Sequence, residues 1–157
     1  MLSSSSEERH RFVGASMRLV WQWVWAQNFQ AVVQAGDFDD LNPSHVGLFR
    51  HPGLDGHRLT DIAQQMQITK QSVHELIGHL ESCGYVVREP DPTDRRARIV
   101  ALTAKGRRLD RLIHEQAGKA EEQIAAILGA RRFAQLQQAL ETLIAELPAI
   151  ADQPRPS

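Results

Sequence analysis

The segment at residues 58–102 restricts the possible folds more than any other feature of this chain, because its hydrophobic period changes once within it. "RLTDIAQQM" and "ITKQSVHELIGHLESCG" carry apolar residues three and four apart, which indicates two helices, and "MQIT" joins them. After Gly84, "YVVRE" and "ARIVALT" are rich in β-branched residues and flank "PDPTDRR", which predicts a hairpin with a long tip. Two helices joined by a tight turn and followed by a hairpin make a helix-turn-helix with a wing.

Helices are predicted before this segment as well. Residues 8–34 contain one glycine and no proline and stop at "AGDFDD", which predicts one long helix. A short second helix follows, with Asn42 as its N-cap and Pro43 at its first position. Thr60 and Thr69 are the predicted N-caps of the third and fourth helices.

Two more helices are predicted after the hairpin. Thr103 is expected to cap a helix over about 103–128, Gly129 interrupts it, and a last helix covers about 131–147. The predicted order is H–H–H–H–β–β–H–H, a mainly α fold with a small β-hairpin wing. We expect all 157 residues to form one unit, with the winged helix-turn-helix at 42–102.

The residues of this segment resemble a known family. "LTDIAQQMQITKQSVHELIGHLESCGYVVREPDPTDRRARIVALTAKG" is similar to the winged helix-turn-helix of the MarR (multiple antibiotic resistance regulator) family. The most specific part is the wing pattern R-x-x-D-P-x-D-R-R-x-x-x-V-x-L-T-x-x-G, which runs from Arg88 to Gly106. The resemblance implies a transcriptional regulator that binds double-stranded DNA, and we expect it to be a repressor.

The fourth helix is the expected recognition helix, and its N-terminal residues should reach base edges in the major groove. Gln71 can pair with adenine, and Lys70 can reach guanine or a phosphate. The predicted contacts on this helix are Thr69, Lys70, Gln71, Ser72 and His74. The alternative is that these side chains form an ordinary solvated helix face.

The wing supplies the remaining predicted DNA contacts, Arg88, Asp94, Arg95, Arg96 and Arg98. The resemblance places Arg96 in the minor groove and pairs it with Asp94. An arginine held by a carboxylate loses less entropy when it enters a narrow, negative groove. The alternative is a surface ion pair, which contributes little to stability.

The charge distribution agrees with a DNA-facing middle. Residues 58–111 carry 10 basic and 7 acidic groups, whereas residues 1–57 and 112–157 each carry 4 basic and 6 acidic groups. A basic middle between acidic ends favours an anionic partner. Glu75 departs from the family pattern, because many relatives carry arginine or another non-acidic residue facing DNA at this position. A carboxylate there would repel phosphate. Glu75 and the net charge of −1 therefore keep a second hypothesis open, a winged-helix protein-interaction module without DNA binding.

The flanking helices are the predicted dimerisation elements, at 8–34 and 103–148. On a helical wheel, apolar residues of the first helix occupy three sectors, and a helix that is apolar all round is buried all round. In a short chain this pattern favours burial between two subunits, and MarR-like proteins are implied to be homodimers. Two recognition helices about 34 Å apart would then suit pseudo-palindromic DNA.

The same resemblance implies a ligand pocket between the dimerisation helices and the DNA-binding domain. Tryptophan side chains offer flat apolar walls with one N–H donor, which suits a small aromatic or phenolic effector. The candidate wall residues are Trp21, Trp25, Phe29, His45, Phe49 and His114. The alternative for each is plain core packing.

Other classes of function find little support in the sequence. It lacks a nucleophile elbow, a phosphate-binding loop and a dinucleotide fingerprint, so we expect neither an enzyme nor a bound cofactor. The seven histidines do not have metal-ligand spacing, and no metal is expected. No apolar run is long enough to span a membrane. The single cysteine, Cys83, predicts a reducing cytoplasm and is expected to be a buried structural thiol.

Overall fold

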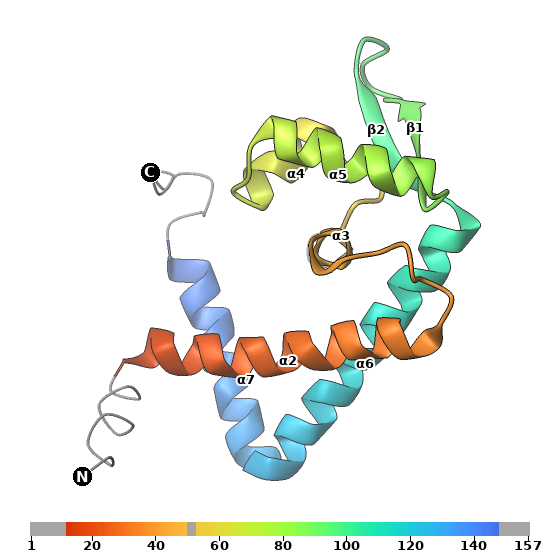
Figure 1. Cartoon of the computed structure of the whole chain (residues 1–157). Coiled ribbons are helices and arrows are strands. Elements are labelled where there is room, and N and C mark those ends of the chain that lie inside the picture. The colour runs from red at the N-terminus through yellow and green to blue at the C-terminus, as the bar shows by residue number, and fades with distance from the viewer. Residues whose placement is uncertain (1–11, 50–52, 148–157) are drawn as a thin grey trace, which may run out of the picture.

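The computed structural model describes residues 12–49 and 53–147 and shows a helical protein with one β-hairpin (Figure 1). The predicted fold class and element order are confirmed. The elements are α2 (Val13–Ala35), α3 (Pro43–Leu48), α4 (Leu59–Gln65), α5 (Lys70–Ser82), β1 (Val86–Pro90), β2 (Arg98–Leu102), α6 (Ala104–Leu128) and α7 (Ala130–Glu146). The first four residues of the predicted 8–34 helix lie outside the described residues.

Side-chain caps fix three of the helix starts as predicted. Asn42 accepts a hydrogen bond from the backbone N–H of His45, Thr69 from that of Ser72, and Thr103 from that of Gly106. The prediction that Thr60 caps α4 is wrong. Arg58 is the N-cap residue and offers no side-chain cap, so the helix begins one residue before Thr60.

The reason for the early start of α4 is a third strand-like segment beside the hairpin. β1 and β2 are antiparallel, with Val86 opposite Leu102. Arg58 forms an isolated antiparallel bridge with Ile99 of β2, and the backbone oxygen of His57 accepts from the Val100 N–H at 2.9 Å. This pairing holds Arg58 in an extended conformation, and α4 can begin only after it.

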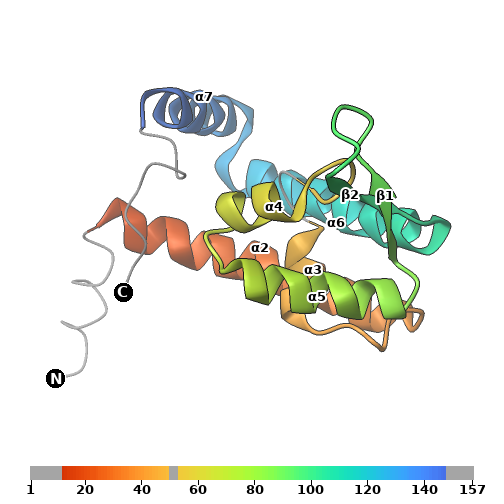
Figure 2. The same ribbon diagram turned by 90° about the horizontal axis from the view of Figure 1, so that it is seen from above.

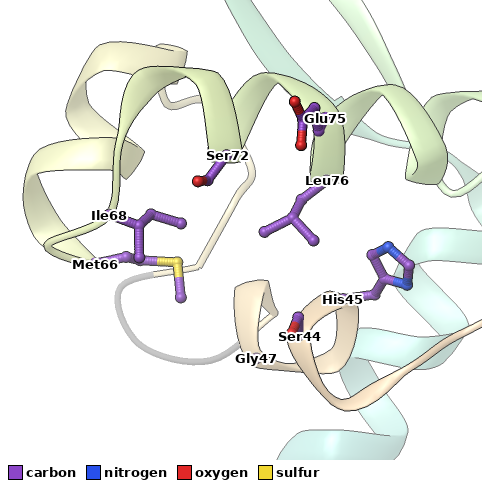
Figure 3. Close-up of a pocket in the computed structure, with 8 residues that line it drawn as sticks. All are labelled: Ser44, His45, Gly47, Met66, Ile68, Ser72, Glu75 and Leu76. Carbon is purple, nitrogen blue, oxygen red and sulfur yellow. The ribbon is translucent and has the colours of Figure 1, made fainter.

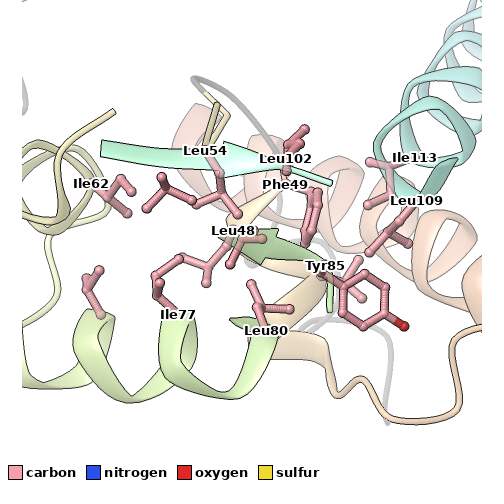
Figure 4. Close-up of a cluster of buried hydrophobic side chains, with 14 of the residues drawn as sticks. Leu48, Phe49, Leu54, Ile62, Ile77, Leu80, Tyr85, Leu102, Leu109 and Ile113 are labelled. Atoms are coloured by element: carbon pink, nitrogen blue, oxygen red, sulfur yellow. The ribbon is translucent and has the colours of Figure 1, made fainter. Parts of the chain in front are cut away.

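The hydrophobic core lies between α3, α4, α5, the hairpin and the N-terminal half of α6 (Figure 4). Ile77 and Leu80 of α5 are fully buried, as are Tyr85 before β1 and Leu109 of α6. Helix α5 is therefore fixed on one side only, and its opposite side stays exposed. The core ends where α6 leaves the winged domain.

Helix α2 crosses α6, and its N-terminal half continues beyond the core toward α7 (Figures 1 and 2). In the C-terminal half Val32 is buried, and Trp25 and Phe29 pack against the core. In the N-terminal half Trp21 is 54% exposed and Phe12 is 74% exposed. The apolar helix is thus buried by its own chain over only part of its length. Among the described helices, none has the length and apolar character that a membrane crossing requires.

Candidate nucleic-acid interface

The exposed face of α5 carries three of the five predicted base contacts. Val73, Ile77 and Leu80 anchor the helix in the core, which leaves Lys70, Gln71 and His74 exposed. The Gln71 Nε2 donates to Glu75 Oε1 at 2.7 Å. The amide nitrogen has a second N–H, so Gln71 can keep this bond while its other N–H and its oxygen pair with an adenine.

Thr69 and Ser72 have a different local role. The two hydroxyl oxygens are 2.8 Å apart, and Thr69 Oγ1 accepts the backbone N–H of Ser72 at 3.0 Å. These bonds complete the N-cap of α5, so both hydroxyls are already engaged at the helix start. Their direct effect is to fix the end of the helix from which Lys70 and Gln71 project.

The tip loop of the wing is held by Asp91, which follows β1 and is buried (6% exposed). Its Oδ1 accepts from the backbone N–H and hydroxyl of Thr93 at 2.7 and 2.6 Å. Its Oδ2 accepts from Nε and Nη2 of Arg58, both at 2.6 Å. The bonds from Thr93, followed by those from Arg58, lower the pKa of Asp91 to about 2. Arg58 thus joins the start of α4 to the wing.

The wing tip exposes Arg95, Arg96 and Arg98. The expected ion pair between the side chains of Asp94 and Arg96, both of which the structure describes, does not form. Asp94 Oδ1 instead accepts the backbone N–H of Arg96 at 3.0 Å, and its Oδ2 lies 3.9 Å from Arg58 Nη2. Asp94 therefore shapes the turn, and the Arg96 side chain projects without an ion pair in the described part of the chain.

Arg88 is less available than the wing-tip arginines. Its Nε lies 3.2 Å from Glu81 Oε2, and its side chain is 24% exposed. This pair links β1 to the C-terminal end of α5. Arg88 is placed to orient the wing relative to the helix, and any contact with phosphate would compete with Glu81.

A polar cluster that the sequence did not predict joins the segment between α2 and α3, the segment between α5 and β1, and the start of α6. The Tyr85 hydroxyl donates to Asp40 Oδ1 at 2.5 Å, and Lys105 Nζ donates to Asp40 Oδ2 at 3.0 Å. Lys105 Nζ also donates to the Cys83 carbonyl at 3.1 Å and lies 4.0 Å from the centre of the Tyr85 ring. Burial raises the pKa of Asp40, but the bonds from Tyr85 and Lys105 outweigh it and lower the pKa overall.

Two histidines connect α3 to α5. The rings of His45 and His79 are stacked, with centroids 4.1 Å apart and planes 4° apart. His79 Nε2 lies 2.7 Å from the Asp40 carbonyl oxygen and 3.6 Å from the sulfur of Cys83, which is half-buried. No sequence signal identified the contacts of His79 with His45 and Asp40, because they join residues 34 and 39 positions apart.

The six predicted ligand residues do not line one cavity within this chain. Phe49 is 1% exposed and packs edge-on against Tyr85, whereas the side chain of His114 is 70% exposed beside Asp110. Trp25 and Phe29 pack together against the core, with ring centroids 6.3 Å apart. The remaining two residues, Trp21 and His45, line two different cavities.

The cavity at His45 lies between α3 and the helix pair α4–α5 and has a volume of about 520 Å³ (Figure 3). It is lined by Ser44, His45, Gly47, Met66, Ile68, Ser72, Glu75 and Leu76. Glu75 thus lies on the part of α5 that meets the cavity. Glu75 therefore lies outside the hydrophobic core, and its carboxylate lies next to this cavity.

The cavity at Trp21 is an apolar groove of about 760 Å³ between α2 and α7. Val13, Met17 and Val20 of α2 contribute to one side, and Leu136 and Leu140 of α7 to the other. Within the described ranges, no group of three or more metal-ligating side chains is close enough together to hold an ion.

Residues 40–97 match the family model described as the MarR family. The chain is 36% identical over 63 residues to the transcriptional activatory protein BadR of Rhodopseudomonas palustris, and 38% identical over 58 residues to the transcriptional regulator HosA of Escherichia coli O111:H-. These alignments cover 40% and 37% of this chain. They span 36% of BadR and 41% of HosA, less than half of either relative.

Similarity to solved structures extends over most of the chain. CouR from Rhodococcus jostii RHA1 bound to p-coumaroyl-CoA has a TM-score of 0.66 at 24% identity, over 88% of this chain and 94% of that chain. CouR bound to a 23-mer DNA duplex has a TM-score of 0.63 at 24% identity, over 92% and 97%. At this identity the likeness shows a shared fold, and the match to the MarR family model covers the winged segment, residues 40–97.

Proposed function

We propose that this protein is a transcriptional regulator that binds specific double-stranded DNA. The observation that carries the proposal is the exposed face of α5, with Lys70, Gln71 and His74, beside a wing whose tip presents Arg95 and Arg96. The hairpin projects beyond the helix pair α4–α5 (Figure 1). A related fold, that of CouR, is known with a DNA duplex bound.

The two elements supply different parts of recognition. Side chains at the start of α5 read base edges, because the major groove distinguishes all four base pairs. The wing arginines enter or flank the minor groove and add affinity that depends on groove width and salt. The bonds of Asp91 to Arg58 and Thr93 hold the wing in place before DNA binds, which reduces the entropy lost on binding.

We propose a homodimer as the DNA-binding unit. Apolar side chains at the start of α2, the end of α6 and the end of α7 remain exposed in one chain, including Phe12, Ile127 and Ile144 at 74%, 80% and 78%. Exposed apolar surface of this extent is typical of an interface. A second copy would cover it and would provide a second recognition helix for a pseudo-palindromic site. Light scattering should therefore give about twice the monomer mass.

We propose that the regulator acts as a repressor that a small aromatic or phenolic ligand releases from DNA. The cavity at His45 supports this proposal, because it lies directly beneath the recognition helix. A ligand that prefers one spacing of the two recognition helices would shift the population of dimers toward it. Ligand binding should alter tryptophan emission and DNA affinity together. If phenolic compounds change neither, the release proposal fails.

The DNA-binding proposal is tested by selecting duplexes from random sequence and measuring affinity by fluorescence anisotropy. Arg96→Ala should weaken binding to a selected duplex at least about tenfold if the side chain occupies a minor groove in each subunit. Arg111→Ala removes an exposed arginine of α6 and serves as the charge-matched control. No enrichment of any duplex, or equal affinity of Arg96→Ala and wild type, would favour the winged-helix protein-interaction module instead.

A further inference from the structure

The cavity beneath α5 has an apolar wall and a charged edge. Met66, Ile68 and Leu76 supply the apolar wall, and Glu75 supplies a carboxylate. Figure 3 shows these side chains gathered around one space between α3 and the helix pair. A volume of about 520 Å³ falls within the range of small-molecule sites.

Among the described residues, no lysine or arginine lines the cavity, so neither supplies a positive charge that would balance the Glu75 carboxylate. The one basic side chain that lines it is His45, whose Nδ1 accepts the backbone N–H of Asn42 at 3.2 Å. Burial, and the neighbouring His79, lower the pKa of His45. A lowered pKa favours the neutral ring, which offers a ligand a hydrogen bond but no positive charge.

Glu75 is exposed, and within the described residues a hydrogen bond from Gln71 orients its carboxylate. Gln71 Nε2 donates to Oε1 at 2.7 Å and fixes the carboxylate at the edge of the cavity. A carboxylate can accept several hydrogen bonds, so Oε2 remains able to accept one from a ligand. A group that donates to this oxygen and also carries positive charge would form a charge-assisted bond.

We propose that this cavity binds a small aromatic amine in its cationic form, with the ring against Met66, Ile68 and Leu76 and the ammonium group at Glu75. The inference rests on the proposed effector cavity and specifies the charge of its ligand. An aromatic carboxylate of the same size would lose its hydration and face Glu75 with no lysine or arginine among the described lining residues, so it is disfavoured.

The test uses three ligands with the same ring: 2-naphthylmethylamine, 2-naphthylmethanol and 2-naphthoate. Chain labelled with ¹³C at the methionine methyl groups reports the location, because Met66 lines this cavity and Met17 lines the groove between α2 and α7. The amine should shift the Met66 signal and leave that of Met17 unchanged. Titration calorimetry should show the amine binding at least about fivefold more tightly than the carboxylate.

Glu75→Gln keeps the size of the side chain and removes its charge. It should weaken amine binding about twofold to fivefold and strengthen carboxylate binding to a similar extent, the range expected for an exposed ion pair. Glu89→Gln removes one exposed carboxylate from β1 and should leave both affinities unchanged.

Three results would overturn the inference. They are a shift of Met17 without Met66, carboxylate binding as tight as amine binding in the wild type, and an amine-to-carboxylate ratio that Glu75→Gln does not alter. None of these measurements contains DNA. DNA affinity is measured separately, without ligand, so failure of the amine-binding inference can be distinguished from failure of the proposed function.

Discussion

Gly106 lies in the first turn of α6, and we predict that replacing it with alanine destabilises the protein. An added Cβ would meet the backbone oxygen of Tyr85 far inside van der Waals contact and would also lie 3.2 Å from Leu102 Cδ2. The same Tyr85 oxygen accepts hydrogen bonds from the backbone N–H and hydroxyl of Thr103, both at 3.0 Å. A methyl group at Gly106 must therefore push α6 away from the start of β1.

The magnitude follows from two opposing effects. Glycine-to-alanine changes inside helices stabilise by up to about 1 kcal/mol, because alanine has the higher helix propensity. Overpacking against a rigid neighbour costs about 1–3 kcal/mol, and loosening a Thr103 bond to Tyr85 costs about 1 kcal/mol more. We expect a net loss of about 2 kcal/mol for Gly106→Ala. For a chain of this size, the midpoint of thermal unfolding should fall by about 4–8 °C.

The assay is thermal and urea unfolding followed by circular dichroism, at one fixed protein concentration because association changes apparent stability. Gly78→Ala in α5 is the matched control, since a Cβ there meets nothing within 4 Å. It should be neutral or stabilising by up to about 1 kcal/mol. If Gly106→Ala is as stable as Gly78→Ala, the close approach of α6 to Tyr85 does not constrain the fold and the reasoning is refuted.

Three further predictions concern hydrogen bonds that position the site. Because the pKa of Asp91 is lowered from 3.8 to about 2 in the folded state, its stabilising contribution is present above about pH 4 and is lost as the pH falls through 2. The urea midpoints of wild type and Asp91→Asn should therefore differ at pH 5 and converge near pH 2, and a constant difference would contradict this cause. Tyr85→Phe should cost about 1–2 kcal/mol by removing the donor to Asp40, and adding Asp40→Asn should cost less in this background than in wild type; strictly additive losses would exclude a direct coupling. Thr69→Ala should cost about 1 kcal/mol and Thr69→Ser much less, measured by thermal unfolding, whereas equal losses would show that the cap is not the cause.

The local elements of this fold could be predicted because their signals are local. Asn42, Thr69 and Thr103 each cap the helix that follows, and the apolar spacing of Val73, Ile77 and Leu80 identifies the buried side of α5. The hairpin was visible from the change to β-branched residues. These patterns depend on neighbours within a few positions, so one sequence is enough to reveal them.

The contacts that position the site could not be predicted, because they join distant residues. Arg58 pairs with Ile99 and bonds to Asp91. Because of this non-local pairing, α4 begins before Thr60, although Thr60 has the residue type of a local N-cap. The bond from Tyr85 to Asp40 spans 45 positions. No periodic pattern encodes such pairs.

Glu75 shows a similar limit within the candidate site itself. In the sequence it is one carboxylate in the expected recognition helix, where it argues against DNA binding. In the structure it stands beside Ser72 and Leu76 at a cavity and bonds to Gln71. Whether the side of α5 that carries Glu75 meets a cavity depends on the position of α3, which the residues of α5 alone do not specify.

We propose that α5 and the wing bind DNA. The most direct test is the salt dependence of binding to a selected duplex. Affinity should fall steeply with salt, because each phosphate contact contributes about 0.9 to the slope of log K against log salt concentration. Replacing both Arg95 and Arg96 with alanine should weaken binding and reduce this slope by about 2 or more per dimer. Gln71→Ala should instead reduce the preference for the selected sequence with little change in slope. An unchanged slope and affinity in the double arginine variant would contradict the account.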